Sequence, residues 1–208
     1  MKKILITGST DGIGKLTAIE LAKAGHEVFL HGRNTNKLRS VIDEVKQASS
    51  NTNVSGFVAD FSDLSAVSKM GKVESETLAD LDVLINNAGI FKSPTPVTAQ
   101  GLDIRFAVNY LAPYVLTNAL LPLLKKNNAP RIINLSSAAQ SPVSLLALSG
   151  KEELSANAAY AQSKLALTMW STYLAENEKS IATISVNPGS LLNTKMANEA
   201  YGQYWSPA

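Results

Sequence analysis

The sequence predicts a doubly wound α/β fold, in which helices cover both faces of one parallel sheet. Short β-type runs alternate with helical patterns from the first residues to about residue 187. Strands that alternate with helices require right-handed crossovers, and these produce a parallel sheet. Gly8, Gly12 and Gly14 follow the first β-type run and open the first helical pattern. At 208 residues the chain fits one domain, which we expect to span residues 1–208.

Each expected strand is a short apolar run, and the elements follow one another in a regular order. Asp63 stands where it would cap the start of the third helix. In open parallel sheets, ligands bind at the carboxyl ends of the strands. The expected strands are Lys3–Ile6, Glu27–His31, Val54–Val58, Leu81–Asn86, Arg131–Leu135 and Ile181–Val186, and the helical stretches between them are 13–24, 35–49, 62–78, 99–126 and 156–178.

The composition is that of an ordinary globular protein, with 45% hydrophobic and 17% charged residues. A net charge of +2 with scattered Lys and Arg gives no reason to expect a nucleic-acid partner. Cysteine is absent, which excludes disulfides and thiolate metal sites. The apolar run Ile4–Ile6 is too short for a signal peptide or a membrane span. We therefore expect a cytoplasmic protein without a membrane span.

The three glycines lie between the first strand and a helix that begins near Ile13. Glycine allows the backbone to turn sharply and to approach a pyrophosphate, and the helix N-terminus offers unpaired N–H donors. A tight turn that binds no ligand is the alternative. Three glycines in a strand–turn–helix setting favour a dinucleotide site.

Arg33 points to NADP rather than NAD as the dinucleotide. A site selective for NAD usually presents an acidic residue to the ribose at the end of the second strand, whereas Arg there accommodates a 2′-phosphate. The sequence at this position is His31-Gly32-Arg33-Asn34, which contains no carboxylate. Arg33 as an ordinary solvated residue is the alternative, and Asp11 in the glycine loop weakens the argument for an extra phosphate.

Tyr160 and Lys164 are four residues apart in a helical stretch, so their side chains project from the same face. Free Tyr titrates near about 10 and Lys near about 10.4, and a fixed positive charge beside a phenol favours the phenolate. Tyr160 is therefore a candidate proton donor, and Lys164 is the neighbouring charge that would lower its pKa. Alone the spacing is a weak signal, because such pairs occur by chance on many helices.

Five short motifs in order resemble the short-chain dehydrogenase/reductase family, and they cover nearly the whole chain. The resemblance implies a Rossmann fold with the strand order 3-2-1-4-5-6. The glycine spacing is similar to that of the single-domain branch. The motifs are Thr7-Gly8-x-x-x-Gly12-x-Gly14, Asn86-Asn87-Ala88-Gly89, Ser136-Ser137, Tyr160-x-x-x-Lys164 and Asn187-Pro188-Gly189.

The resemblance implies a catalytic tetrad of Asn109, Ser137, Tyr160 and Lys164. Tyr160 would transfer a proton to or from the substrate oxygen, Ser137 would hydrogen-bond that oxygen, and Lys164 would hold the nicotinamide ribose. Ser137 rather than Ser136 matches the family's serine. The expected cofactor-binding residues are Gly8, Ser9, Gly12, Ile13, Gly14, Arg33, Asp60, Asn87, Gly89, Tyr160, Lys164, Pro188 and Thr194.

Asn109 lies four residues before Pro113, in the long helical stretch. Proline cannot donate the hydrogen bond that the carbonyl at i−4 expects, so we expect a bend or a π-type bulge there. The freed carbonyl would then hold a water that extends a proton relay from Lys164. The alternative is that Pro113 only kinks the helix and Asn109 packs nearby.

The segment between Ser137 and Tyr160 holds twenty-two residues, more than many similar enzymes have. It contains the apolar run Val143–Leu148, which would suit an apolar substrate beside the reaction centre. This lengthened segment is most similar to the retinol dehydrogenase and WW-domain-oxidoreductase branch. A surface hairpin or a disordered loop explains the insertion equally well.

The remaining expectations concern the chain's end and its packing. The resemblance implies a further helix and a last strand after Thr194, so we expect a chain that is incomplete at its C-terminus. His26 and His31 lack metal-ligand spacing and are interpreted as structural. Trp170, Met169 and Leu174 are expected in the core or at a subunit interface.

We therefore predict an NADP(H)-preferring oxidoreductase, with NAD as a possible cofactor and without a metal. It would act on a small-molecule alcohol or carbonyl, and a homo-oligomer is possible. A non-catalytic dinucleotide-binding sensor or scaffold is the alternative from another class. A lyase or epimerase that uses bound NAD transiently is a third.

Overall fold

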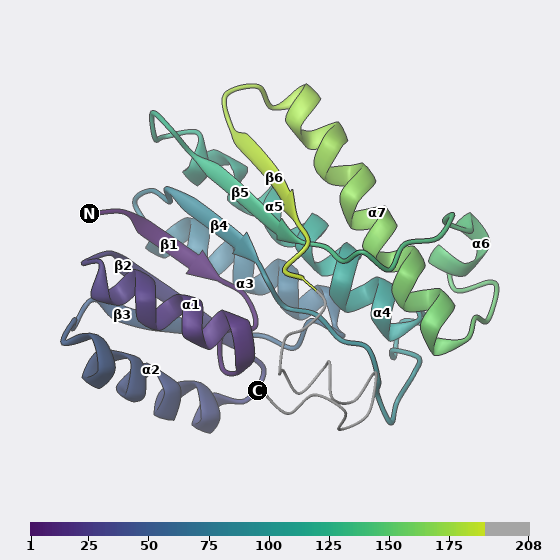
Figure 1. Cartoon of the computed structure of the whole chain (residues 1–208), viewed down its shortest axis with the longest axis horizontal. Helices are drawn as coiled ribbons and strands as arrows, with labels where there is room; N and C mark the ends of the chain where they lie inside the picture. The colour runs from purple at the N-terminus through teal and green to yellow at the C-terminus, as the bar shows by residue number, and fades with distance from the viewer. Residues whose placement is uncertain (190–208) are drawn as a thin grey trace.

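The computed structural model describes residues 1–189, and these form one parallel six-stranded sheet with helices on both faces (Figure 1). The strands lie in the order β3-β2-β1-β4-β5-β6, which confirms the predicted fold. The strands are β1 (Lys3–Ile6), β2 (Glu27–Gly32), β3 (Val54–Val58), β4 (Val83–Asn86), β5 (Arg131–Leu135) and β6 (Ala182–Val186). The helices are α1 (Gly12–Lys23), α2 (Thr35–Ser49), α3 (Leu64–Thr77), α4 (Ile104–Phe106), the π-helix η1 (Ala107–Leu111), α5 (Ala112–Leu124), α6 (Leu145–Leu148) and α7 (Ala156–Asn177).

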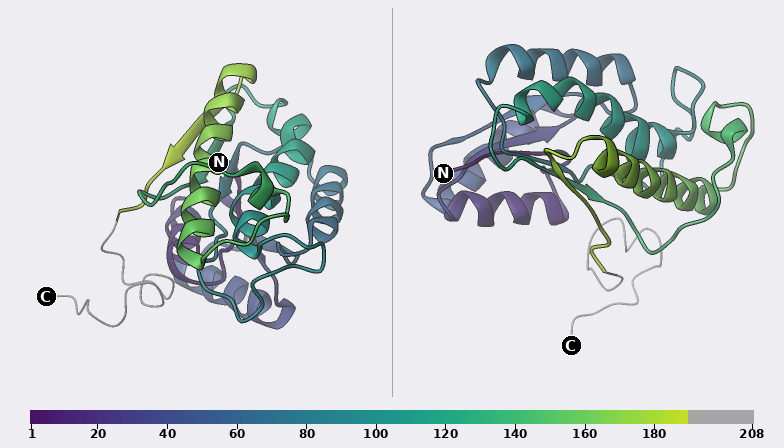
Figure 2. Two further views of the ribbon diagram at one scale, coloured as in Figure 1. Left: turned by 90° about the vertical axis from the view of Figure 1, so that its right-hand side faces the viewer. Right: turned by 90° about the horizontal axis from the view of Figure 1, so that it is seen from above.

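Two apolar cores lie on opposite faces of the sheet, because successive strand residues point to opposite sides. On β1, Leu5 belongs to the core under α3, α5 and α7. Ile4 and Ile6 belong to the core under α1 and α2. Figure 2 shows α1 on one side of the sheet and α3 and α5 on the other. The chain order reverses between β1 and β4, and this switch point is where the ligand cleft of such folds lies.

The helix predicted over 99–126 begins later, at Ile104, and it is interrupted. Residues 98–101 form a turn in which the Gly101 N–H donates to the Thr98 carbonyl at 3.0 Å. The Asp103 carboxylate then caps the helix by accepting from the Arg105 N–H. The helix therefore begins at the residue that follows the cap Asp103, rather than at the first residue of the apolar periodic pattern. The fourth strand likewise begins at Val83 rather than at Leu81.

A π-type bulge occupies Ala107–Leu111, directly before Pro113, as the proline argument predicted. The Ala112 N–H donates to the Ala107 carbonyl five residues back, which is the π-helical pattern. Pro113 is the second residue of α5, and its missing N–H leaves the continuous helical stretch without one donor at the bulge. The bulge places Asn109 inside the protein, where its side chain is fully buried.

The predicted caps and packing residues are largely confirmed. Asp63 caps α3 by accepting from the Ser65 N–H at 2.8 Å. Trp170 and Leu174 are buried on α7, whereas Met169 on the same helix is 59% exposed. Within the segment between Ser137 and Tyr160, the apolar run forms the short helix α6 rather than a hairpin.

One continuous helical stretch among the described residues, Ile104–Leu124, is long and apolar enough to cross a membrane. More than half of its most apolar window is buried inside the protein, and α5 packs closely on α3. A core helix of a globular fold satisfies the same test.

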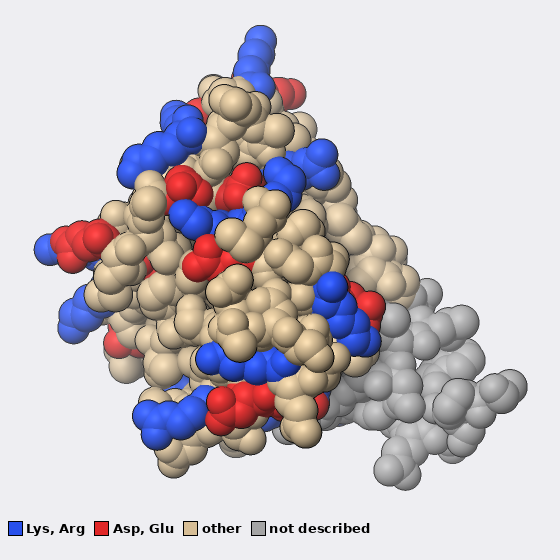
Figure 3. Space-filling model, turned by 90° about the vertical axis from the view of Figure 1, so that its left-hand side faces the viewer, with Lys and Arg blue, Asp and Glu red and all other residues tan. Residues whose placement is uncertain are grey.

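On the face shown in Figure 3, basic and acidic side chains are intermixed.

Candidate active site

A cavity of about 430 Å³ opens at the carboxyl edge of the sheet. Most of the residues that the sequence predicted to bind the cofactor line this cavity. Ser9, Asn109 and Ser137 are not among its lining residues, and Thr194 lies outside the described residues. The nominated residues that line it are Gly8, Gly12, Ile13, Gly14, Arg33, Asp60, Asn87, Gly89, Tyr160, Lys164 and Pro188.

The glycine loop is built so tightly that side chains would not fit. Gly8 has φ +63°, and a Cβ on it would lie 2.7 Å from the Ala88 Cα. A Cβ on Gly14 would lie 2.6 Å from the Gly8 carbonyl oxygen. The Asn87 amide holds the loop from the next strand by donating to the Thr7 and Gly8 carbonyls, at 2.8 and 3.0 Å. The loop thus leads the α1 N-terminus to the cavity, as a bound pyrophosphate requires.

Ser9 lies behind the loop rather than in the cavity. Its side chain is fully buried, and its hydroxyl donates to the Ile6 carbonyl at 2.8 Å. The same oxygen accepts from the His31 N–H at 2.9 Å. The Ser9 hydroxyl therefore joins the loop to β2.

Two cations line the cavity near the end of β2. Arg33 is exposed there and lines the cavity, and Lys37 from the first turn of α2 lines it as well. Lys37 Nζ lies 3.0 Å from the Asp11 carboxylate, which also caps α1. The hydrogen bond from Lys37 is the main reason that the Asp11 pKa is lowered. Asp11 is therefore paired with Lys37, which reduces its effect on an incoming phosphate.

Lys164 is buried beneath Tyr160 on α7. Its ammonium donates to the Leu135 carbonyl at 2.8 Å, and burial lowers the Lys164 pKa to about 8. Lys164 Nζ lies 5.8 Å from the centre of the Tyr160 ring. The half-buried Tyr160 also packs edge-on against Phe91, with ring centres 5.1 Å apart. The structure thus brings the predicted phenol and ammonium together at the cavity wall.

The two adjacent serines occupy different environments. Ser136 is buried, and its hydroxyl contacts the Lys164 carbonyl at 3.1 Å and the Thr168 hydroxyl at 2.6 Å. Ser137 is half-buried, and its hydroxyl accepts from the Ala139 N–H at 3.2 Å. Ser136 lines the cavity, but its hydroxyl is engaged in packing β5 on α7. Ser137 is the more exposed hydroxyl, and it does not line the cavity.

Comparison with known proteins agrees with this geometry. A family profile described as short chain dehydrogenase matches residues 2–205 of the chain. The chain belongs to the short-chain dehydrogenase family.

Human relatives include polyprenol dehydrogenase, 33% identical over 95% of this chain, and retinol dehydrogenase 11, 34% identical over 96%. The chain spans 62% and 64% of the lengths of these two relatives. A Shigella flexneri short-chain dehydrogenase solved with NADP superposes with a TM-score of 0.78 at 27% identity, covering 97% of this chain and 82% of that one. An Escherichia coli short-chain dehydrogenase solved with NADPH gives 0.77 at 28% identity, with the same coverage.

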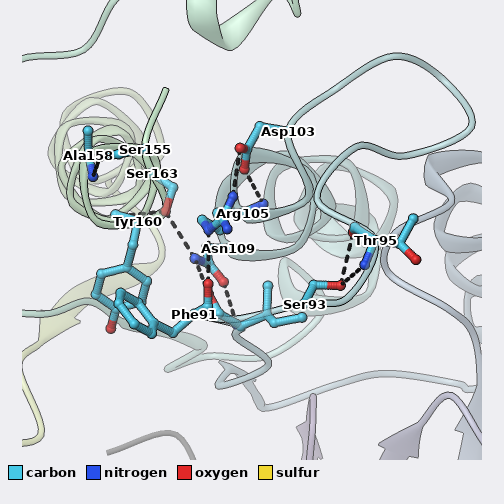
Figure 4. Close-up of polar contacts among 11 residues, drawn as sticks. Phe91, Ser93, Thr95, Asp103, Arg105, Asn109, Ser155, Ala158, Tyr160 and Ser163 are labelled. Atoms are coloured by element: carbon cyan, nitrogen blue, oxygen red, sulfur yellow. Dashed lines mark hydrogen bonds and ion pairs between the residues drawn. The ribbon is translucent and has the colours of Figure 1, made fainter. Parts of the chain in front are cut away.

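In this member of the short-chain dehydrogenase family, the Asn109 side chain clamps the loop after β4 (Figure 4). It accepts from the Ile90 N–H at 2.7 Å and donates to the Ile90 carbonyl at 3.0 Å. Its amide also donates to the Ser163 hydroxyl, which donates to the Tyr160 carbonyl. Asn109 therefore ties the π-helix to the turn of α7 that carries Tyr160.

Sequence reasoning missed a buried ion pair that supports Phe91. Arg105 is 5% exposed, and its Nη1 lies 2.7 Å from the Asp103 carboxylate. Arg105 Nε donates to the Phe91 carbonyl at 2.9 Å, and Figure 4 shows the Phe91 ring beside Tyr160. The sequence gives no local signal for this pair. Its role depends on the burial of Arg105 against Phe91, which lies fourteen residues earlier in the chain.

Proposed function

We propose that the chain is an NADP(H)-preferring oxidoreductase acting on an alcohol or its carbonyl. The observation that carries the proposal is that one cavity is lined both by the glycine loop and by the Tyr160–Lys164 pair. When bound, the nicotinamide would supply or accept the hydride. The residues of the chain would handle the proton and the substrate oxygen.

Tyr160 would donate a proton to the substrate oxygen in reduction and accept it in oxidation. A Lys164 pKa of about 8 leaves this side chain mainly cationic at neutral pH. Its charge favours the phenolate form of Tyr160, and its bond to Leu135 fixes its position. Ser137 would hydrogen-bond the substrate oxygen as charge develops there.

The preference for NADP(H) rests on Arg33, which directly follows β2, with Lys37 of α2 nearby and paired with Asp11. Guanidinium and ammonium groups bind phosphate through charge-assisted hydrogen bonds. The NADP and NADPH complexes of the two bacterial structural relatives support this preference. Reduction follows as the physiological direction, since the cellular NADP pool is normally kept reduced.

An apolar substrate is supported by the cavity and by the relatives. Ile90, Phe91 and Val108 contribute apolar lining to the cavity that Tyr160 also lines. Leu145 and Leu146 of α6 do not line the cavity, but at 75% and 59% exposure they add apolar surface to the segment that leads to α7. Polyprenol and retinol dehydrogenases are named for long apolar alcohols. We propose that the substrate is a long apolar alcohol or the corresponding carbonyl compound.

A Tyr160→Phe comparison tests the proposal. The protein would be titrated with NADPH and then assayed on aldehydes and ketones of increasing apolar length. We expect Tyr160→Phe to lower kcat at least about 100-fold, because general acid catalysis contributes about that much. The Kd for NADPH should stay within about threefold of the wild-type value, since a change of about 0.7 kcal/mol corresponds to that factor.

Tyr173→Phe is the matched control, because Tyr173 lies on the same helix and is 62% exposed. It should behave as the wild type in binding and turnover. A wild-type protein that binds NADPH but reduces no member of the panel would contradict the enzymatic proposal.

A further inference from the structure

We propose that His31 is a positioning residue that sets the phosphate loop for the dinucleotide. The inference rests on the proposed function only in assuming that a dinucleotide occupies the cavity. His31 sits at the end of β2, two residues before Arg33, and it is 3% exposed. The reaction described above makes no use of it.

The ring of His31 connects two walls of the cavity. Its Nδ1 accepts from the Gly8 N–H at 3.0 Å, and its Nε2 lies 3.0 Å from the Ala59 carbonyl oxygen. A carbonyl can only accept, so Nε2 carries the proton and Nδ1 is the free acceptor. Gly8 opens the phosphate loop, and Ala59 immediately precedes Asp60 at the other wall. One neutral tautomer therefore satisfies both walls at once.

The surroundings of the ring leave it little freedom to move. It stacks on Phe61 with ring centres 4.1 Å apart and an angle of 26° between the planes. The His31 main chain is bonded to Ser9 in both directions, at 3.0 Å from the Ser9 N–H and 2.9 Å to the Ser9 hydroxyl. The loop is thus attached to β2 by three hydrogen bonds, and the side-chain bond is the one that reaches Gly8.

This attachment matters because of the backbone at Gly8. Gly8 has a positive φ, and its backbone lies so close to Ala88 on the β4 side that a side chain would not fit between them. The bond from His31 holds the same peptide from the β2 side. A loop held in place before the ligand arrives loses less conformational freedom on binding, so its affinity for the ligand is higher.

The His31 ring can accept from the Gly8 N–H only while it is uncharged. An imidazolium would direct a second N–H at the Gly8 N–H, and the two donors would repel each other. Burial lowers the His31 pKa to about 4, against the opposing influence of the Ala59 carbonyl and the Asp60 carboxylate. The ring is neutral across the physiological range.

Three substitutions separate the two bonds of the ring. His31→Asn can present its amide oxygen near the place of Nδ1 and so keep an acceptor for Gly8. His31→Gln can present its amide N–H near the place of Nε2 and keep only the bond to Ala59. His31→Leu fills similar space and removes both bonds. NADPH affinity measured by fluorescence titration, together with kcat at saturating NADPH, is the readout.

We expect the Kd for NADPH to rise about tenfold in His31→Leu and His31→Gln, since about 1.4 kcal/mol corresponds to one hydrogen bond of this kind. In His31→Asn it should stay within about threefold. The kcat should change less than about twofold in all three, because the chemistry at Tyr160 is untouched. His26→Asn is the control, since His26 contacts the Lys2 N–H and lines no part of the cavity.

The inference is overturned if His31→Gln and His31→Leu bind NADPH as tightly as the wild type, or if Gln preserves binding and Asn does not. Failure of the proposed function has a different signature, in which the wild type itself binds no dinucleotide. Should His31→Leu fail to fold, the Asn and Gln pair still decides. Thermal unfolding without nucleotide checks that each variant is folded.

Discussion

Lys164 is the residue at which burial and charge compete most directly in this protein. It is 4% exposed, and its lowered pKa reflects the cost of removing an ammonium from water. The Leu135 carbonyl offsets part of that cost with a hydrogen bond at 2.8 Å. A buried cation kept beside a tyrosine at a cavity wall is a common sign of a functional site.

At the same scale, Arg33 is expected to control the choice of nucleotide. Arg33→Gln removes a charge-assisted donor, so the Kd for NADPH should rise about 10- to 100-fold. The Kd for NADH should change less than about twofold, because NADH lacks the 2′-phosphate. Arg39→Gln, an exposed position on α2 outside the cavity lining, is the control. Equal losses for both nucleotides would show that Arg33 does not recognise the 2′-phosphate.

At the scale of elements, helix α3 carries a buried acid that its packing does not satisfy. Glu74 is fully buried, and neither of its carboxylate oxygens has a hydrogen-bond partner within residues 1–189. Burial raises the Glu74 pKa from 4.5 to about 8. Between about pH 4.5 and pH 8, Glu74 is therefore protonated in the folded protein and ionised in the unfolded chain. The free energy of unfolding falls as pH rises through that window, because the folded state must hold a proton that the unfolded state does not.

Replacing Glu74 with Gln should remove this loss. We expect Glu74→Gln to match the wild type within about 1 kcal/mol at pH 5 and to exceed it by roughly 2–4 kcal/mol at pH 8.5, as a shift of several pKa units implies. Urea unfolding at the two pH values measures the difference. Glu76→Gln on the same helix is the control, because the Glu76 side chain is 62% exposed. A difference that does not depend on pH would contradict the assignment to Glu74.

At the scale of the whole molecule, the cavity joins elements from both halves of the sheet. Gly8 and Arg33 come from the β1–β2 half, and Tyr160 and Lys164 come from the half that contains β4 to β6. A ligand that spans the cavity therefore contacts both halves and binds only the folded chain. Its binding should stabilise the protein as one cooperative unit.

We expect NADPH at 100 times its Kd to stabilise the fold by about 2.7 kcal/mol. For a domain of this length, that corresponds to a rise in Tm of roughly 5–11 °C. Differential scanning calorimetry measures the shift, and Tyr160→Phe should retain most of it because the aromatic ring and Lys164 still line the cavity. A shift below about 1 °C under these conditions would argue against a dinucleotide site.

The sequence by itself determined the kind and order of the elements, the glycine loop and the four-residue spacing of Tyr160 and Lys164. These depend on local periodicity and on steric rules that act within a few residues. The bulge before Pro113 was also predictable, since a missing N–H is a local fact. Only the tertiary structure decided that Ser9 faces the interior, that Lys37 joins Arg33, and that His31 bridges two walls. Those roles depend on contacts between residues that are far apart in the sequence. Burial in the folded chain then shifts the pKa of side chains such as His31.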